Sequence, residues 1–199
     1  ALAIDPSARV AYAIGTNGVA AAVDLDSLRV TTHVLGRQLA KSFNGEELQA
    51  RWLGDGVLAV AGQKYATTAD ASGNETISQT PLGLRLVDVR TWSDRMIDRG
   101  ATGFALVGGG LVAYGTAWTS ATGTSSTLAG MGVAAYRADG SPLFRALGGR
   151  PVAMVQTAGG RAYAWIAGVR AFHVAVVDLA TGAVERERDL PPTSLLADY

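Results

Sequence analysis

The stretch that decides the fold is residues 172–190, which read FHVAVVDLATGAVERERDL. An apolar run leads into a turn at 180–182, and a second strand, 183–190, runs back. Apolar runs of about 5–8 residues, rich in Val and bounded by Gly and Asp, are typical of β-hairpins. Similar hairpins are expected at 18–36 and 83–100. The chain therefore reads as one hairpin pattern that recurs.

The hairpin closes a longer unit that occurs four times. Each unit opens with a short apolar strand, a turn containing Gly or Ser, a second apolar strand and a connection of variable length. The units start near residues 2, 50, 103 and 152, a period of about 50 that is typical of propeller blades. We therefore predict an all-β fold, a β-propeller of about four four-stranded blades in one domain, 1–199. The predicted blades are 1–36, 49–100, 102–148 and 151–190.

Several predicted strands are apolar on both faces, for example VAAAV at 19–23 and VAVV at 174–177. A strand with one solvent-exposed face alternates more strictly between apolar and polar residues. Stacked blades would cover both faces, and the regular period favours them over the alternative, a two-sheet β-sandwich. One helical turn is expected at 44–48, where Asn precedes Gly and two acidic residues.

Composition excludes several classes of protein. Lys and Arg number 17, Asp and Glu also number 17, and the net charge is zero, so we expect no nucleic acid and no anionic membrane as partner. The chain has no cysteine, which excludes disulfides, thiolate zinc sites and cysteine nucleophiles. Its apolar runs are far shorter than the ~20 residues of a membrane helix, so we expect no membrane insertion. Because Ala1 precedes what reads as strand, we expect an N-terminal part to have been removed.

Two of the units resemble the YVTN-type β-propeller repeat of bacterial surface-antigen-like proteins. The resemblance rests on DPSARVAY at 5–12 and AVDL at 22–25, and on GGRAY at 159–163 and VVDLATG at 176–182. It implies a propeller fold and an extracytoplasmic or cell-surface location. Propellers of this kind serve as scaffolds, ligand binders, surface proteins and enzymes, so the resemblance is specific for fold and not for function.

The ends of the array raise the question of how the ring closes. Larger propellers usually share one blade between the two chain ends, and units one and four each read as complete. Four blades could close alone, two copies could form an eight-bladed ring, or the chain could be part of a larger propeller. We favour the last account, with the remaining blades supplied by a missing segment or a second chain. Open apolar blade faces would otherwise exceed what a monomer exposes.

Residues that could carry chemistry are few. Asp24, Asp88 and Asp178 recur at the end of the third strand in units one, two and four, and Tyr136 breaks the series in unit three. We expect each carboxylate to accept backbone N–H groups in the following turn. A ring of carboxylates that binds a cation is the alternative. The two histidines, His33 and His173, fall at different strand positions. We therefore assign no catalytic residue, no metal site and no cofactor.

The most informative feature is a pair of long connections, 64–81 and 117–130, rich in Ser, Thr and Gly. In a propeller, connections between second and third strands emerge on one rim, so these two loops should lie side by side. Function often resides on loops held by a rigid scaffold, although tolerated insertions would look the same. The tentative ligand-binding residues are Lys64, Tyr65, Asn74 and Trp118.

Together these patterns predict a non-catalytic binding or scaffold module. Its rim loops in units two and three would bind a protein or carbohydrate ligand, with Tyr65 and Trp118 as apolar anchors and Lys64 and Asn74 as polar contacts. The alternative is a lactonase- or quinoprotein-like enzyme with a metal or cofactor in the central channel.

Overall fold

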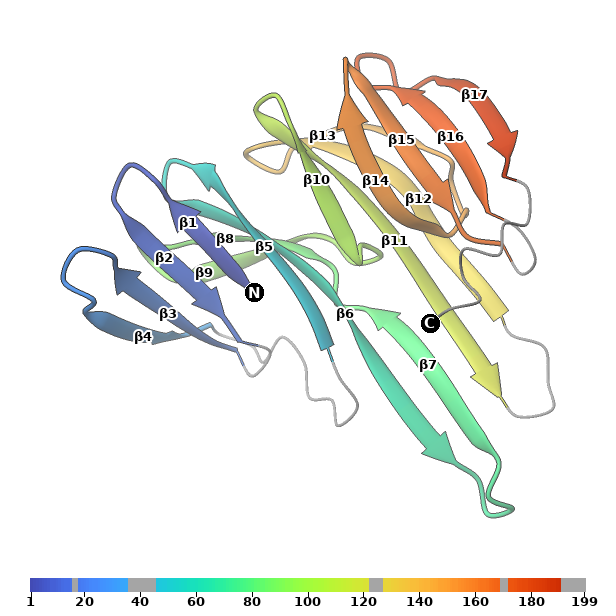
Figure 1. The fold of residues 1–199 in the computed structure, drawn as a ribbon, viewed down its shortest axis with the longest axis horizontal. Coiled ribbons are helices and arrows are strands. Elements are labelled where there is room, and N and C mark those ends of the chain that lie inside the picture. The colour runs from blue at the N-terminus through green and yellow to red at the C-terminus, as the bar shows by residue number, and fades with distance from the viewer. Residues whose placement is uncertain (16–17, 36–45, 122–126, 169–171, 191–199) are drawn as a thin grey trace.

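The computed structural model describes residues 1–15, 18–35, 46–121, 127–168 and 172–190. These residues form seventeen β-strands and no helix, and Figure 1 shows the strands as successive twisted sheets. The first and last sheets are antiparallel meanders of four strands each. Their strands are β1 (Leu2–Asp5), β2 (Val10–Ile14), β3 (Val19–Asp24) and β4 (Val30–Val34), then β14 (Val152–Ala158), β15 (Arg161–Ile166), β16 (His173–Asp178) and β17 (Val184–Asp189).

Two more four-stranded meanders lie between them and are fused into one nine-stranded sheet. One contains β5 (Glu46–Gly54), β6 (Val57–Ala69), β8 (Leu84–Asp88) and β9 (Ser93–Asp98). The other contains β10 (Gly103–Val107), β11 (Gly110–Ala121), β12 (Thr127–Arg137) and β13 (Pro142–Ala146). The remaining strand, β7 (Glu75–Pro81), pairs with both β6 and β11. Four consecutive four-stranded antiparallel sheets make this a β-propeller, which confirms the predicted fold class.

Two local predictions differ from the structure. Residues 46–48, expected in a helical turn, begin strand β5 instead, because they pair with β6 from Glu46 opposite Lys64 onward; residues 44 and 45 lie outside the described part of the chain. The described parts of the long connections are also mostly strand rather than loop, and residues 122–126 lie outside the described part of the chain. Most of their residues extend β6 and β11 or form β7 and the start of β12.

The core lies between consecutive sheets rather than inside any one of them. Tyr12 and Ile14 of the first sheet pack on Leu58 and Val60 of the second. The two later junctions are built in the same way, and alanines such as Ala59, Ala113 and Ala164 are fully buried there. The two middle sheets are thus covered on both faces, which explains why strands such as β8 carry apolar residues on both faces, whereas the first and last sheets are each covered on one face.

A buried polar cluster also joins the second and third sheets. Asp98 at the end of β9 is 7% exposed and accepts hydrogen bonds at 2.6 Å from both the Tyr136 hydroxyl and the Arg145 guanidinium. Its other carboxylate oxygen accepts the Gly100 N–H at 2.9 Å. Burial and the bond to Asp98 raise the pKa of Tyr136 well above its ordinary value. The phenol therefore stays protonated and acts as the donor.

In the part of the chain that the structure describes, no helix has the length and apolar character needed to cross a membrane.

Candidate functional site

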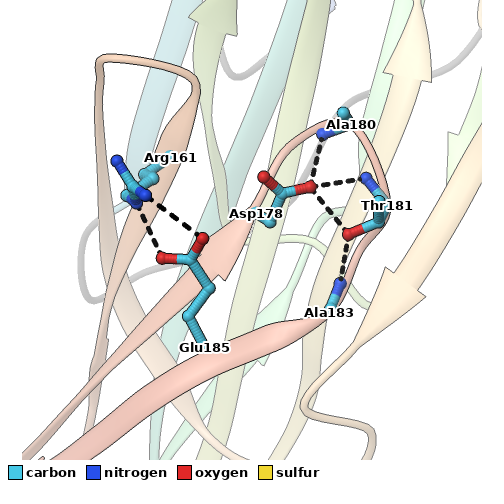
Figure 2. Close-up of polar contacts among 6 residues, drawn as sticks. All are labelled: Arg161, Asp178, Ala180, Thr181, Ala183 and Glu185. Carbon is cyan, nitrogen blue, oxygen red and sulfur yellow. Dashed lines mark hydrogen bonds and ion pairs between the residues drawn. The ribbon is translucent and has the colours of Figure 1, made fainter.

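The recurrent aspartates cap the turn after the third strand of their sheets. Asp178 accepts hydrogen bonds from the N–H groups of Ala180 at 3.1 Å and Thr181 at 2.8 Å, and from the Thr181 hydroxyl at 2.7 Å (Figure 2). These bonds lower the pKa of the Asp178 carboxyl, and the bond from the Thr181 hydroxyl contributes most. The hydroxyl in turn accepts the Ala183 N–H at 3.2 Å, so the whole turn is held by its own side chains.

Asp24 and Asp88 act in the same way. Asp24 accepts from the Ser27 N–H at 2.7 Å, and Asp88 accepts from the Arg90 N–H at 2.8 Å. The predicted turn-capping role is therefore confirmed for all three aspartates. Among the described residues, no group of three or more His, Asp or Glu side chains is arranged to hold a metal ion.

The two histidines lie in different sheets and have different partners. His33 on β4 stacks on Trp92 with ring centroids 4.2 Å apart. Nδ1 of His173 on β16 lies 2.6 Å from a carboxylate oxygen of Asp189. Each histidine therefore has a local packing or pairing role.

Three of the four sequence-predicted binding residues, Lys64, Tyr65 and Trp118, lie on a strand extension that projects beyond the second and third sheets (Figure 1). We call this part the extension and define it as residues 63–69, 75–81, 116–121 and 127–131 of β6, β7, β11 and β12. Its strands pair in the order β6, β7, β11, β12. It is a small antiparallel sheet built from segments that are up to about 60 residues apart in the chain.

The structure brings Tyr65 and Trp118 together on one face of the extension. Gln79 of β7 pairs with Tyr65 on one side and with Trp118 on the other, and residues paired directly across strands project to the same face. The two aromatic rings lie 6.5 Å apart between centroids, inclined at 56°. Trp118 also pairs with Leu128, which continues the row onto β12.

A network of amides and hydroxyls supports this aromatic pair. The Gln63 side-chain amide donates to the Tyr65 hydroxyl and to the Glu47 carboxylate, each at 2.7 Å. Gln79, which is 6% exposed, donates to Gln63 and to the Thr116 hydroxyl, the latter at 3.2 Å. Burial, with a smaller contribution from Glu47, raises the pKa of the Tyr65 phenol. Near neutral pH the face therefore presents a neutral phenol and neutral amides.

The same network borders a cavity of about 200 Å³ at the base of the extension. Gln63, Glu47 and Tyr114 line it, together with residues that begin the innermost strands of three successive sheets. Gln49 fixes its wall, because its side-chain amide donates to the Phe104 carbonyl at 2.8 Å and accepts the Phe104 N–H at 3.1 Å. The aromatic face and the cavity are thus continuous through Gln63.

The other two sequence-predicted residues lie elsewhere. Lys64 follows Gln63 and precedes Tyr65 on one strand, so its side chain projects from the opposite face of the extension. Asn74 lies in the turn before β7, where its backbone and side-chain amides both donate to Asp70 at 3.0 Å. Asn74 therefore shapes the turn at the tip and is separate from the aromatic pair.

Sequence reasoning missed Gln63, Gln79, Thr116 and Glu47. A local signal existed only for Gln63, which stands two residues before Tyr65 and shares its face in any strand. The others meet Tyr65 through strand pairs that no short-range pattern in the sequence reveals.

No protein-family model matches the sequence, and no curated protein matches it. Among solved structures, the chain is similar to BamB from Moraxella catarrhalis, with 13% identity, a TM-score of 0.41, and coverage of 94% of this chain and 60% of that one. It is also similar to Saccharomyces cerevisiae Sqt1, with 12% identity, a TM-score of 0.44, and coverage of 99% of this chain and 63% of that one. A third similar structure is the β-propeller domain of Cps50 (Swd1) from Myceliophteria thermophila, with 14% identity, a TM-score of 0.36, and coverage of 96% of this chain and 73% of that one.

The chain thus spans less than two thirds of the length of the first two of these structures. Its own four successive four-stranded meanders, with a core between each neighbouring pair, make it a β-propeller.

Proposed function

We propose that the chain is a non-catalytic β-propeller module that binds a segment of another protein on the face of the extension bearing Tyr65 and Trp118. The observation that carries this proposal is the meeting of these two rings, 53 positions apart in the sequence, at a centroid distance of 6.5 Å. Both residues are half-buried. Aromatic residues held in this way are typical anchors of protein interfaces.

The neighbouring side chains favour a peptide. Ile77 pairs with Ser120 and Thr67, one row further toward the tip, and is 40% exposed. It extends an apolar surface alongside the rings, while the amides of Gln63 and Gln79 lie next to them. A face that combines apolar anchors with amides suits an apolar side chain and its adjoining peptide groups. Rings inclined at 56° offer no shared flat platform for a sugar.

Selection of a displayed random-peptide library on the 199-residue chain tests this proposal. Peptides selected on the wild type should bind the double variant Tyr65→Ala/Trp118→Ala at least tenfold more weakly, because the apolar anchors would be lost. Isothermal titration with synthetic copies of the selected peptides measures this loss.

Lys64→Ala is the matched control, since it changes the opposite face of the same strand and should leave the affinity unchanged. Equal binding by wild type and double variant would place the binding surface elsewhere. Binding to a glycan panel that is lost with the double variant, together with failure to select any peptide, would replace the peptide by a carbohydrate.

A further inference from the structure

The outer face of the first sheet is apolar and exposed. Leu2, Ile4 and Val30 are 60%, 50% and 56% exposed, and strand pairing places Ile4, Ala11, Val23 and Val30 in one row on this face. In the second sheet the corresponding face carries Leu58 and Val87, which are fully buried against the first sheet. A contiguous exposed apolar face normally marks an interface.

The outer face of the last sheet, at the opposite end of the array, is also apolar and partly exposed. Met154, Trp165 and Val174 form one row of the last sheet, and Tyr163 lies in the next. Met154 and Tyr163 are 39% and 36% exposed. In the third sheet the face that points the same way along the array carries Val112 and Val133, which are buried against the fourth sheet.

The three internal junctions share one kind of contact, although His33 lies one row further along its strand than Arg95 and Phe144 do along theirs. A side chain on the outer strand of each sheet packs on the turn between the third and fourth strands of the next. His33 stacks on Trp92, Arg95 donates to the Asp139 carbonyl beside Gly140, and Phe144 lies against Gly182, where an added Cβ would meet its ring at 2.7 Å.

The turn residues that receive these contacts are equivalent. Trp92 and Gly182 each stand four positions after the Asp that ends the third strand, and Gly140 stands three positions after Arg137 in a turn that is one residue shorter. All three have a positive φ, of 55°, 80° and 75° for Trp92, Gly140 and Gly182. Leu28 stands at the same place after Asp24, with a φ of 57°, and is 72% exposed. A large apolar residue in this strained conformation thus occupies the receiving position of the first sheet.

The last sheet supplies the matching outer-strand residue. Arg186 is paired with Val176 in the way that Arg95 is paired with Leu86 and Phe144 with Ala135, and it is exposed. The turn that holds Leu28 also holds two carboxylates, Asp24 and Asp26. Asp26 is paired with Arg9 at 2.7 Å and Asp24 accepts hydrogen bonds within the turn, so the contact rests on the equivalent positions of Arg186 and Leu28 and on the apolar faces beside them.

We propose that the last sheet of one copy packs on the first sheet of a second copy, with Arg186 against the Leu28 turn, and that the reciprocal contact closes a ring of two chains. A single chain carries both halves of the contact, so a second copy satisfies both exposed faces at once. Two such contacts related by a two-fold axis leave no apolar blade face open.

Because the chain has no cysteine, the double variant Leu28→Cys/Arg186→Cys tests the proposed contact directly. At the equivalent internal junction, Phe144 Cβ lies 3.0 Å from a Cβ placed on Gly182, close to the ~3.8 Å between Cβ atoms of a disulfide. Mild oxidation should give a covalent dimer that resists denaturation and reverts to monomer on reduction. Each single variant should stay monomeric on a denaturing gel. Its cysteine would face Arg186 or Leu28 of the other copy, and neither residue can form a disulfide.

Light scattering provides a measurement that needs no cross-link. The wild type should have twice the 20.5 kDa mass of one chain. Arg186→Glu, which places a carboxylate beside the apolar Leu28 and the Asp24 carboxylate, should shift the dimer toward monomer. Lys64→Glu on the extension is the charge-matched control and should leave the mass unchanged.

Three outcomes would overturn the proposal. A disulfide within one chain would mean that four blades close alone, and a ladder of oxidised trimers and larger species would mean an open filament. A monomeric wild type at micromolar concentration would mean that further blades or another protein cover these faces.

Discussion

At the scale of single residues, this propeller uses carboxylates in two different environments. The turn aspartates are half-buried, and their hydrogen bonds are satisfied within a few residues of the chain, as Asp178 shows. Asp98 is buried and holds together residues from two sheets, Tyr136 and Arg145. The first kind could be predicted from sequence because the partners are local, whereas the partners of Asp98 are 38 and 47 residues away.

This difference predicts a large effect at Asp98. Asp98→Ala removes the acceptor of the Tyr136 hydroxyl and leaves that hydroxyl buried without its partner, so the free energy of unfolding should fall by about 3 kcal/mol. Urea denaturation monitored by tryptophan fluorescence measures this fall.

Asp26→Ala is the comparison variant, because Asp26 and its partner Arg9 have side chains that are 66% and 63% exposed. Exposed ion pairs contribute little to stability, so this variant should unfold close to the wild type. Equal stability of both variants would mean that the buried cluster has no stabilising role.

At the scale of elements, β7 is the strand that converts two separate sheets into one. It has partners on both sides, since Ile77 lies opposite Thr67 and Ser120. The sequence showed only a polar connection rich in Ser and Thr there. Its strand character depends on β11, which lies some 40 residues further along the chain, and so no local propensity could reveal it.

Ile77→Pro should therefore unfold the extension while the propeller sheets persist. Proline removes a donor from a strand that is paired on both sides and is tolerated in sheets only at edges. Hydrogen exchange should show loss of protection over 63–69 and 75–81 and retained protection over β14–β17. Ile77→Val, which keeps the ladder, should exchange like the wild type, and global loss of protection with Ile77→Pro would mean that the extension and the propeller unfold as one unit.

At the scale of the whole molecule, the decisive feature is that the array of four sheets has two open ends. The internal junctions bury side chains such as Val60, Phe104 and Val177 almost completely, whereas Leu2, Ile4 and Leu28 at one end stay exposed. Each internal sheet thus depends on two neighbours, and each terminal sheet has only one.

If a second copy covers the ends, stability should depend on concentration. Raising the protein concentration a hundredfold should raise the melting temperature measured by calorimetry, because association stabilises the folded state by mass action. The monomeric variant Arg186→Glu should melt at a lower temperature that does not change with concentration. A wild-type melting temperature that is equally independent of concentration would contradict the two-chain ring.

The sequence by itself determined the hairpins, the turn aspartates and the repeat of about 50 residues that is typical of propeller blades, because each of these depends on residues close together in the chain. Only the tertiary structure decided that the long connections are strands, that Tyr65 meets Trp118 while Lys64 and Asn74 do not, and that Leu28 and Arg186 occupy equivalent positions at opposite ends. These features depend on which distant strands pair and pack, and that choice is made by the burial of whole sheet faces rather than by any local pattern.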